Sequence, residues 1–309
     1  MAMKFSIVIP TYNEEHDIAG TLDACVALDY PDKEIIVVDD STDSTPDIVR
    51  RYADRNVRLV RPVRREGRCG ARNVGILEAQ GDVVVILNAD ARLRCDFLQR
   101  IAPYYEQGYD YVLINSQVQN LHQLFARYVD AMSIGSQSGD PSWMEWTEGF
   151  SCRREAAIHA GMFPTGFAVP ICAGEDGFFG DNLRKTGAKK KIDFSITVDH
   201  IAPGELAEYW YIRKGRGQGS PQIRRFLQKW SMPAIMAWAG LRIAKTICYV
   251  VLIIPMVLTV ANVCRHSSRR AHDFFPFLWA WLVEQLAFHV GEWQSIAEIA
   301  RAERALSRK

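Results

Sequence analysis

Four short apolar runs rich in β-branched residues alternate with segments of helical periodicity along the first ninety residues. Such runs predict buried strands, because a strand covered on both faces carries apolar side chains in succession. The predicted strands are residues 4–10, 34–40, 57–62 and 82–90. The segments between them predict helices at residues 14–28, 44–54 and 69–81. Strands joined by helices predict right-handed βαβ units. We therefore expect an α/β fold with a mostly parallel sheet and helices on both faces.

The pattern changes after a last β-branched run, residues 195–200, that ends at His200. Residues 205–220 are aromatic and basic and contain three glycines. Residues 246–263 carry no charged side chain over a length that is sufficient to cross a bilayer. A further apolar stretch follows at residues 274–293. The C-terminal third therefore predicts hydrophobic helices that attach the chain to a membrane.

Basic residues flank the uncharged stretch on both sides. They are Arg242 and Lys245 before it and Arg265, Arg269 and Arg270 after it. Positively charged flanks remain on the cytoplasmic side of a membrane. A simple single span would place one flank outside, so a re-entrant or in-plane arrangement fits these charges better. The alternative is that the apolar segments form the buried helical core of a protein that is not attached to a membrane.

The overall charge is nearly balanced, with 37 Lys and Arg against 36 Asp and Glu. This balance argues against a nucleic-acid partner, which favours a uniformly basic surface. Lys and Arg dominate from Arg213 onward, where Trp and apolar runs accompany them, as is typical of a membrane surface. The seven cysteines form no CxxC pair, and the N-terminal apolar run is too short for a signal peptide. We therefore expect reduced thiols and a cytoplasmic domain.

Polar and acidic residues collect where the predicted strands end. Ligands of such sheets bind beyond the carboxyl ends of the strands. These ends read PTYNE, DDSTD and NAD, and they supply Glu14, Asp39, Asp40, Asp43 and Asp90. The N-terminal region contains neither a GxGxxG motif nor a Walker A motif. The site is therefore not that of a dinucleotide-binding fold or a P-loop ATPase.

An acidic site repels a bare diphosphate and accepts it when a divalent cation lies between the two. Mg²⁺ and Mn²⁺ prefer carboxylate oxygens together with substrate phosphates. Asn88 and Asp90 alternate along an extended segment, so their side chains point to the same side. The sequence therefore predicts a Mg²⁺ or Mn²⁺ site at Asp90, although acidic triplets of this kind are also common in surface loops.

Five motifs occur in an order and spacing that resemble the family-2 glycosyltransferases, whose fold is the GT-A nucleotide-sugar-binding fold. They are IVIPTYNEE, EIIVVDDSTDST, GARNVGI, ILNADARL and GEDGFFGDNLRKTG. The segment FSCRREAAIHAGMFP resembles the part of that family that precedes the last motif. The resemblance covers residues 4–200. It implies a GT-A catalytic domain over residues 1–205, followed over residues 206–309 by a basic closing segment and membrane-attachment helices.

The resemblance implies donor-binding roles for residues at the strand ends and in the third motif. These residues are Pro10, Thr11, Tyr12, Glu14, Asp39, Asp40, Arg72, Asn88, Ala89 and Asp90. Asp40 matches the residue that binds the nucleotide base, and Arg72 approaches the donor. Asp90 and His200 are the implied metal ligands, because Asp90 matches the metal-binding end of the family's acidic motif and some relatives have a metal- or phosphate-contacting histidine at the place of His200. A structural role is the alternative for His200. Asn88 stands where the family usually has aspartate, which predicts either weaker metal affinity or a site that Asp90 carries alone.

The GEDGFFGDNL segment places Glu175 and Asp176 at the start of a predicted helix that Phe179 and Leu183 anchor in the core. The positive end of the helix dipole stabilises carboxylates there, so capping alone explains the pair. The resemblance instead implies that Asp176, with Glu175 beside it, is the catalytic base that takes the proton of the acceptor hydroxyl. One direct displacement then inverts the anomeric centre without a second, nucleophilic carboxylate.

The segment EYWYIRKGRGQG resembles the part of membrane-attached relatives that closes over the donor diphosphate. This resemblance implies that Arg213 and Arg216 bind phosphate. A solvated basic linker beside the membrane is the alternative. Residues 222–226 read QIRRF and depart from the QxxRW motif of processive relatives, which favours the addition of a single sugar.

We therefore expect a membrane-attached, metal-assisted, inverting glycosyltransferase of the hexosyltransferase type. It would move a sugar from a UDP- or GDP-sugar to a lipid-linked or polysaccharide acceptor at the cytoplasmic face of the cell membrane. Two other classes remain open. A nucleotidyltransferase would release pyrophosphate and would need no base at Asp176. A non-catalytic scaffold would bind the sugar nucleotide without turnover.

Overall fold

The computed structural model describes residues 3–65 and 67–307. The chain forms two compact units, and each is described by itself. Unit 1 takes its described residues from Met1–Gln117, Ser142–Thr165 and Glu175–His200. Unit 2 takes its described residues from Val118–Pro141, Gly166–Gly174 and Ile201–Lys309. Two stretches that precede residue 205 therefore pack with the C-terminal helices. The division into a catalytic domain at residues 1–205 and a membrane-attachment region at residues 206–309 stays a prediction.

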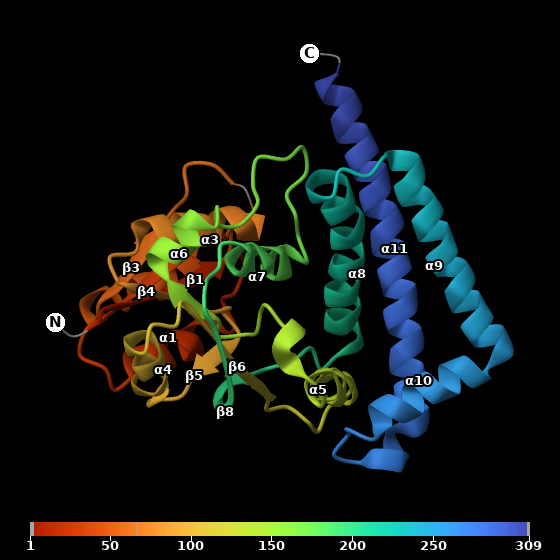
Figure 1. Ribbon diagram of the computed structural model, residues 1–309, viewed down its shortest axis with the longest axis horizontal. Coiled ribbons are helices and arrows are strands. Elements are labelled where there is room, and N and C mark those ends of the chain that lie inside the picture. The colour runs from red at the N-terminus through yellow and green to blue at the C-terminus, as the bar shows by residue number, and fades with distance from the viewer. Residues whose placement is uncertain (1–2, 66, 308–309) are drawn as a thin grey trace. The chain divides into compact units, whose positions relative to one another are not determined.

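Unit 1 is built on a mixed sheet (Figure 1). Its strands are β1 (Phe5–Thr11), β2 (Lys33–Asp39), β3 (Val57–Val60), β4 (Val83–Ile86), β5 (Ala91–Leu93), β6 (Tyr111–Val118), β7 (Ser151–Arg153) and β8 (Lys190–His200). Their order across the sheet is β3-β2-β1-β4-β7-β6-β8-β5. The first four strands of the chain pair in parallel, with Ile7 of β1 opposite Ile35 of β2 and Val85 of β4. The other strand pairs with a defined register are antiparallel.

The predicted α/β sheet is confirmed, and its parallel part is confined to β1–β4. Each of these strands lies within four residues of its predicted bounds, and β1 and β2 lie within one, because each is a β-branched run that the sheet buries. β7 extends the sheet by pairing antiparallel with both β4 and β6. β5 pairs antiparallel with β8, and this register places Ala91 opposite His200. The antiparallel strands thus bring the end of β8 to the residues that follow β4.

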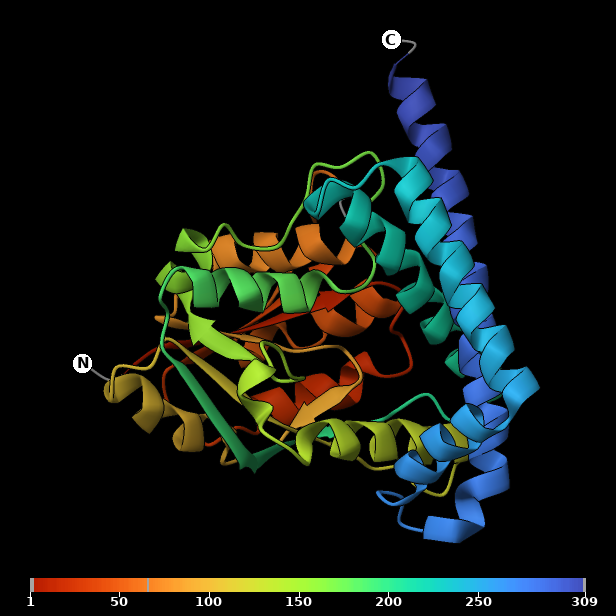
Figure 2. The same ribbon diagram turned by 45° about the vertical axis from the view of Figure 1, so that its right-hand side comes forward.

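Helices cover both faces of the sheet (Figure 2). They are α1 (Ile18–Val26), α2 (Thr45–Arg50), α3 (Gly67–Glu78), α4 (Phe97–Glu106), α6 (Arg154–His159) and α7 (Glu175–Lys185), with 3₁₀ turns at Ala53–Arg55 and Pro141–Trp143. Buried side chains of α1, α2 and α4 pack with one face of the central strands in a single core. α3 packs closely on β1, where a Cβ on Gly75 would lie 2.1 Å from Val8 Cγ1. This approach requires glycine at position 75.

Unit 2 is helical among its described residues. Its helices are α5 (Leu124–Gln137), α8 (Leu206–Gln222), a π-helical turn (Ile223–Leu227), α9 (Met232–Leu252), α10 (Ile254–Cys264), a 3₁₀ turn (Arg270–Asp273) and α11 (Phe274–Leu306). A Cβ on Gly217 of α8 would lie 2.0 Å from the carbonyl oxygen of Phe288 of α11, so the two helices meet at backbone distance. The predicted closing segment is therefore a regular helix in which Gly217 has a packing role. Its closing role stays a prediction.

The uncharged stretch at residues 246–263 is divided between two helices. The helix breaks at Ile253, whose φ of 60° lies in the left-handed region, and α10 begins at the next residue. Pro255 explains the break, because proline lacks the amide hydrogen and its ring clashes with the carbonyl four residues earlier. By length and composition, α9 is the one helix in the described part of the chain that could cross a membrane.

Candidate active site

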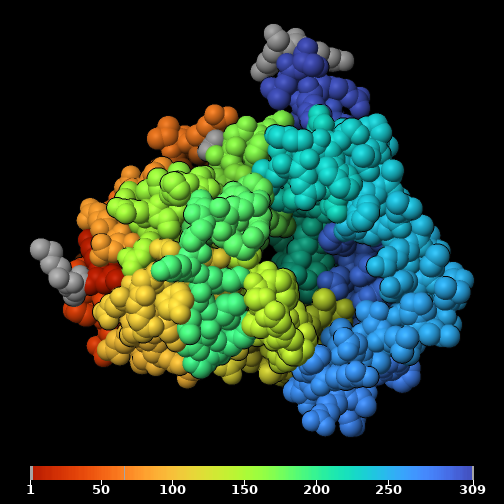
Figure 3. Space-filling model, viewed as in Figure 1, coloured from red at the N-terminus to blue at the C-terminus, as the bar shows by residue number. Residues whose placement is uncertain are grey.

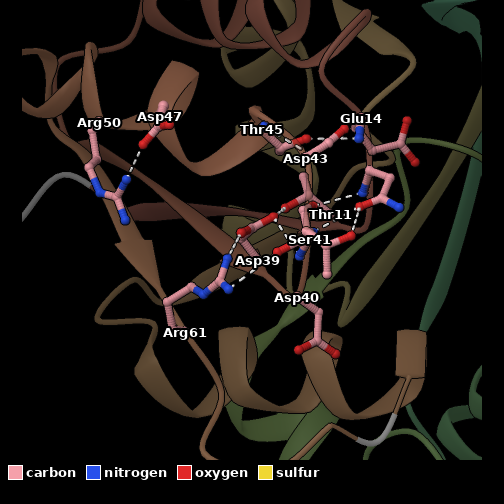
Figure 4. A network of polar contacts seen from close by, with 12 residues as sticks. Thr11, Glu14, Asp39, Asp40, Ser41, Asp43, Thr45, Asp47, Arg50 and Arg61 are labelled. Carbon is pink, nitrogen blue, oxygen red and sulfur yellow. Dashed lines mark hydrogen bonds and ion pairs between the residues drawn. The ribbon is translucent and has the colours of Figure 1, made fainter.

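Thr11 and Asp39 end the neighbouring strands β1 and β2 and are joined by a buried hydrogen bond. The Thr11 hydroxyl donates to Asp39 Oδ1 over 2.8 Å, and the Arg61 guanidinium contacts the second carboxylate oxygen (Figure 4). Parallel pairing brings the two residues together, since Thr11 is opposite Asp39 in the register. Asp39 is fully buried, so its charge is neutralised inside the protein rather than presented to a ligand.

The loop after β1 is fixed to the loop after β2 by further hydrogen bonds. The Asn13 amide donates to Ser41 Oγ over 2.7 Å, and the Glu14 amide donates to Thr45 Oγ1 over 2.9 Å (Figure 4). Asn13 adopts a left-handed backbone with φ of 58°, a conformation that asparagine tolerates better than most residues. The sequence PTYNE therefore folds into a rigid turn that fixes the direction of Tyr12 and Glu14.

Tyr12, Asp40 and Arg65 form an open cluster beside this turn. The Arg65 guanidinium lies 4.1 Å from the centre of the Tyr12 ring, and its Nε lies 3.3 Å from Asp40 Oδ2. Tyr12 is 45% exposed, in contrast to the buried Asp39. An aromatic ring and an accessible carboxylate at the carboxyl edge of a sheet provide a stacking surface and a hydrogen-bond acceptor for a planar ring.

Asn88 and Glu148 pair beyond the end of β4. Glu148 Oε1 accepts the Asn88 amide hydrogen over 3.0 Å, and Glu148 Oε2 accepts the side-chain Nδ2 over 2.6 Å. Burial, followed by the negative charge of Asp90, raises the pKa of Glu148. An aspartate at position 88 would place a second carboxylate against Glu148. The amide therefore suits this site, which explains in physical terms why Asn88 departs from the expected pattern.

Asp90 and His200 lie together as the β5–β8 register requires. Asp90 Oδ2 is 3.5 Å from His200 Nε2, whereas Asp90 Oδ1 is buried and has no hydrogen-bond partner within residues 3–65 and 67–307. Burial, followed by the charges of Asp90 and Asp17, raises the pKa of Glu14 to about 7. The carboxylates at this edge thus repel one another. No three His, Cys, Asp or Glu side chains of the described chain form a preformed metal site.

A divalent cation nevertheless fits this edge. Asp90 offers a buried carboxylate oxygen without a protein partner, and His200 offers an imidazole nitrogen beside it. Mg²⁺ and Mn²⁺ are often held by one or two protein groups and complete their shell with substrate phosphates and water. Burial is the main cause of the raised pKa values of Glu14 and Glu148, and a positive ion would relieve the second cause, repulsion by Asp90.

The two acidic residues that begin α7 have different surroundings. Glu175 is buried, and its Oε1 lies 2.9 Å from Arg72 Nη1 and 3.9 Å from Arg68 Nη1. Asp176 is half-buried, and its Oδ1 accepts the amide hydrogen of Gly177 over 2.7 Å. Glu175 is thus held in an ion pair inside the unit, whereas no ion pair to Asp176 occurs among the described residues.

Arg72 is 2% exposed and belongs to the support of the site. Its guanidinium lies 4.9 Å from the Phe163 ring and 5.2 Å from the Trp146 ring, and its Nη2 lies 3.4 Å from Asn88 Oδ1. Arg72 therefore connects the residues after β4 with the start of α7. This arrangement brings Asn88, Asp90, Glu175 and Asp176 into one region of unit 1.

Two predicted site residues lie in unit 2, on α8. Arg213 is 3% exposed, its Nη1 is 3.2 Å from Glu284 Oε1, and its guanidinium lies 4.9 Å from the Tyr209 ring. Arg216 is exposed on the same helix. In this structure Arg213 is an internal ion-pair partner, and its role toward phosphate stays a prediction.

Sequence reasoning missed Glu148, Arg65 and Arg68. Glu148 lies two residues before Phe150, where the recognised segment begins, so its proximity to that motif was an available signal. Arg65 and Arg68 precede the third motif in a basic run that carries no specific spacing. Their carboxylate partners lie at distant positions of the chain and can be identified only once the sheet is formed.

The mixed sheet and its acidic edge place the protein in the class of GT-A glycosyltransferase folds. Mannosyltransferase PcManGT from Pyrobaculum calidifontis, solved with GDP-Man and Mn²⁺, matches with a TM-score of 0.63 over 96% of this chain and 87% of that chain, at 21% identity. Residues 1–349 of Staphylococcus aureus TarS match with a TM-score of 0.54 over 94% of this chain and 90% of that chain, at 17% identity. At these identities the likeness concerns the fold.

The family model described as glycosyl transferase family 2 matches residues 6–172, and the chain belongs to this family. An undecaprenyl-phosphate 4-deoxy-4-formamido-L-arabinose transferase from Pseudomonas syringae is 37% identical over 114 residues, which are 35% of this chain and 34% of that protein. The Staphylococcus aureus poly(ribitol-phosphate) beta-N-acetylglucosaminyltransferase TarS is 33% identical over 117 residues, 36% of this chain and 20% of that protein. The chain thus spans about a third or less of the length of these two relatives.

Proposed function

We propose that the protein is a membrane-attached, metal-assisted, inverting glycosyltransferase. It transfers a sugar from a UDP- or GDP-sugar to a lipid-linked or polysaccharide acceptor at the cytoplasmic face of the membrane. The observation that carries this proposal is the start of α7 in a family 2 chain, where Glu175 is locked in a buried ion pair and Asp176 is not. A fold that matches glycosyltransferases solved with UDP-GlcNAc or GDP-Man supports the donor class.

The donor nucleotide binds at the carboxyl ends of β1 and β2. Tyr12 stacks on the base, and Asp40 accepts a hydrogen bond from it, while Arg65 holds both side chains in place. Thr11 and Asp39 act through the backbone turn that they fix, because both are buried. Pro10 and Glu14 border the ribose on the same turn.

The diphosphate lies beside Asn88, Ala89 and Asp90. Asp90 and His200 would hold Mg²⁺ or Mn²⁺, which would supply positive charge to offset the charge that develops on the leaving nucleoside diphosphate. Glu148 orients Asn88 through two hydrogen bonds. Arg213 and Arg216 of α8 are additional phosphate ligands, and Arg213 must exchange Glu284 for phosphate to reach that role.

Asp176 is the general base. It lies on the first turn of α7, where the positive end of the helix dipole interacts favourably with a carboxylate. The carboxylate takes the proton from the acceptor hydroxyl while that oxygen attacks the anomeric carbon and the nucleoside diphosphate departs. One displacement inverts the anomeric configuration.

Membrane attachment is supported by the exposed apolar side chains of unit 2. α9 and α10 expose Leu241, Val251, Ile254 and Leu258, each by more than 60% of its surface. Large apolar side chains exposed to this extent on two consecutive helices support a membrane or protein interface. An in-plane or re-entrant arrangement of the broken α9–α10 pair agrees with the basic residues on both sides of it.

The test is release of nucleoside diphosphate by the detergent-solubilised full chain, with UDP- and GDP-sugars, Mn²⁺ or Mg²⁺ and a total lipid extract. Asp176→Asn should lower kcat by about 10²–10⁴-fold, the usual contribution of a general base. Asp181→Asn is the matched control, because Asp181 lies on the same helix and pairs with exposed Arg184 and Lys185. Equal rates for wild type and Asp176→Asn would remove the base assignment. Release of pyrophosphate would indicate a nucleotidyltransferase, and donor binding without any release would indicate a scaffold.

A further inference from the structure

Two charged residues interrupt an otherwise uncharged pair of helices in unit 2. Within α9 (Met232–Leu252) and α10 (Ile254–Cys264), the charged side chains are Arg242 and Lys245. They are three positions apart and therefore lie on the same face of α9. Removing a cation from water into an apolar environment is costly, so two cations on one face of an apolar helix point to an anionic partner.

A cavity of about 530 Å³ opens at these two cations, between α9, α10 and α11. This volume lies in the range of small-molecule sites. Three aromatic side chains, Trp238, Tyr249 and Trp281, line the cavity together with Arg242 and Lys245. Figure 3 shows α9 and α10, in cyan and light blue, at the surface of the protein. The cavity thus combines positive charge with an aromatic wall.

The positive charge of the cavity is only partly balanced by the protein. Arg242 Nη1 lies 3.8 Å from Glu292 Oε1, at the long end of an ion pair, and the same oxygen accepts a hydrogen bond from the Ser220 hydroxyl over 3.0 Å. The Lys245 ammonium lies 5.4 Å from the centre of the Tyr249 ring, and no salt bridge to it occurs in the described part of the chain. One carboxylate therefore lies near Arg242, and none lies within salt-bridge distance of Lys245 among the described residues.

Two polar side chains of the wall can complete the contacts to an anion. The hydroxyl of Thr246 is 2.9 Å from His289 Nε2, so the imidazole can orient it, and Gln285 contributes an amide. A phosphate oxygen accepts hydrogen bonds from hydroxyl, amide, ammonium and guanidinium groups, and this cavity contains all four. The polar side of the cavity is thus suited to a phosphate group.

The other side of the cavity is suited to hydrocarbon. Leu241 lines the cavity and is itself 65% exposed, so the apolar wall continues onto the outer surface of α9. Trp and Tyr side chains with Lys and Arg near them are typical of the boundary between headgroups and acyl chains. A soluble phosphate would leave this apolar surface uncovered, whereas a lipid would cover it.

We propose that this cavity binds the phosphate headgroup of a phosphomonoester lipid, whose hydrocarbon chain lies along the exposed apolar surface of α9 and α10. A phosphomonoester carries a charge of about −1.5 to −2 at neutral pH, which matches the two cations Arg242 and Lys245. The proposal rests on the membrane attachment in the proposed function and is independent of sugar transfer. Polyprenyl phosphate and diacylglycerol phosphate share this chemistry.

The experiment measures binding of the detergent-solubilised full chain to nanodiscs of phosphatidylcholine that contain either polyprenyl phosphate or phosphatidic acid, without donor or metal. The variant is Arg242→Gln/Lys245→Gln. The matched control is Arg301→Gln/Arg304→Gln, which removes equal charge from exposed positions of α11 in the same unit. We expect the cavity variant to bind about thirty-fold more weakly, the factor for two cations at a membrane surface, and the control to bind like wild type.

Quenching of Trp238 and Trp281 by lipids with brominated chains provides a local readout, since both rings line the cavity. Equal binding by wild type and the cavity variant, or equal loss in the control, would overturn the proposal. Competition by inorganic phosphate as strong as by either lipid would overturn its lipid part. A preference for one lipid identifies the source of the phosphate. If the double variant does not fold, Lys245→Gln alone tests the same site, because that side chain is exposed.

Because nucleoside diphosphate release is measured separately, the two proposals fail in different ways. Release of nucleoside diphosphate without binding of a phosphomonoester lipid would support the transferase proposal and overturn the lipid-binding proposal. Lipid binding through Arg242 and Lys245 without release of nucleoside diphosphate would support the lipid-binding proposal and contradict the transferase proposal.

Discussion

Replacing Glu175 by Gln should destabilise unit 1 by leaving the Arg72 guanidinium without its anion. Both side chains are almost completely buried, with exposures of 1% and 2%, and their charged atoms are 2.9 Å apart. Removing one partner of a buried ion pair usually costs about 3–5 kcal/mol, because the remaining charge has lost both water and its counter-ion. The position is therefore far more sensitive than an exposed salt bridge, which is worth about 0–1 kcal/mol.

The surroundings of Arg72 set the expected value at the lower end of that range. Two aromatic rings lie within 5.2 Å of its guanidinium, and cation–π contacts of this kind contribute roughly 0.5–2 kcal/mol each. Asn88 Oδ1 at 3.4 Å provides a weak acceptor. We therefore expect Glu175→Gln to lower the free energy of unfolding by about 3 kcal/mol. Arg72→Met should cost less, since Arg68 at 3.9 Å still faces Glu175.

The assay is denaturant-induced unfolding of wild type, each single variant and Arg72→Met/Glu175→Gln. The double variant should be more stable than the sum of the single effects predicts, by about 1–3 kcal/mol, because the two residues interact directly. Glu155→Gln is the control, since Glu155 is exposed on α6, and it should remain within about 0.5 kcal/mol of wild type. Unfolding of Glu175→Gln at the same midpoint as the control, or strictly additive single effects, would refute the reasoning.

Three further results should follow from contacts within each unit. Glu14 has a folded-state pKa of about 7, above its ordinary 4.5, so the folded state holds this proton more tightly and wild type should lose stability as pH rises from 4.5 to about 7. Glu14→Gln should remove that loss, as thermal unfolding at several pH values would show. Asn88→Asp removes a hydrogen-bond donor to Glu148 and adds a like charge, so we expect it to lower the free energy of unfolding by about 1–3 kcal/mol. Mn²⁺ should stabilise this variant more than it stabilises wild type, as thermal unfolding with and without the ion would show. Gly217→Ala should cost about 1–3 kcal/mol through the 2.0 Å clash, whereas Gly215→Ala on the same helix, with open space around its Cβ, should be neutral or stabilising.

The parallel part of the sheet could be predicted from sequence because its strands are continuous β-branched runs. β2, for example, was expected at residues 34–40 and occupies Lys33–Asp39. β7 has three residues and carries no such signal; it is a strand because β4 and β6 lie on either side of it. Glycines concealed the regularity of α8, since their low helix propensity is outweighed by the close packing of α8 against α11.

The polar edge of the candidate site was visible in sequence, whereas its pairings were not. Asp90 was identified from the end of a predicted strand, and its neighbour His200 lies 110 positions later. Only the antiparallel β5–β8 register brings the two together. Glu148 lies beside a recognised motif, but its pairing with Asn88 joins positions 60 residues apart and could be identified only once the sheet is formed.

The different surroundings of Glu175 and Asp176 follow from helix geometry. Successive residues of an α-helix are separated by about 100° around its axis, so one of two neighbours can face the interior while the other does not. Glu175, Phe179 and Leu183 are four positions apart and form one buried stripe of α7. The Arg72 ion pair and this apolar stripe thus fix the rotation of the helix together, and they leave the Asp176 carboxylate at the half-buried margin. A base in that position needs no ion pair of its own, because the pair made by its neighbour determines where it points.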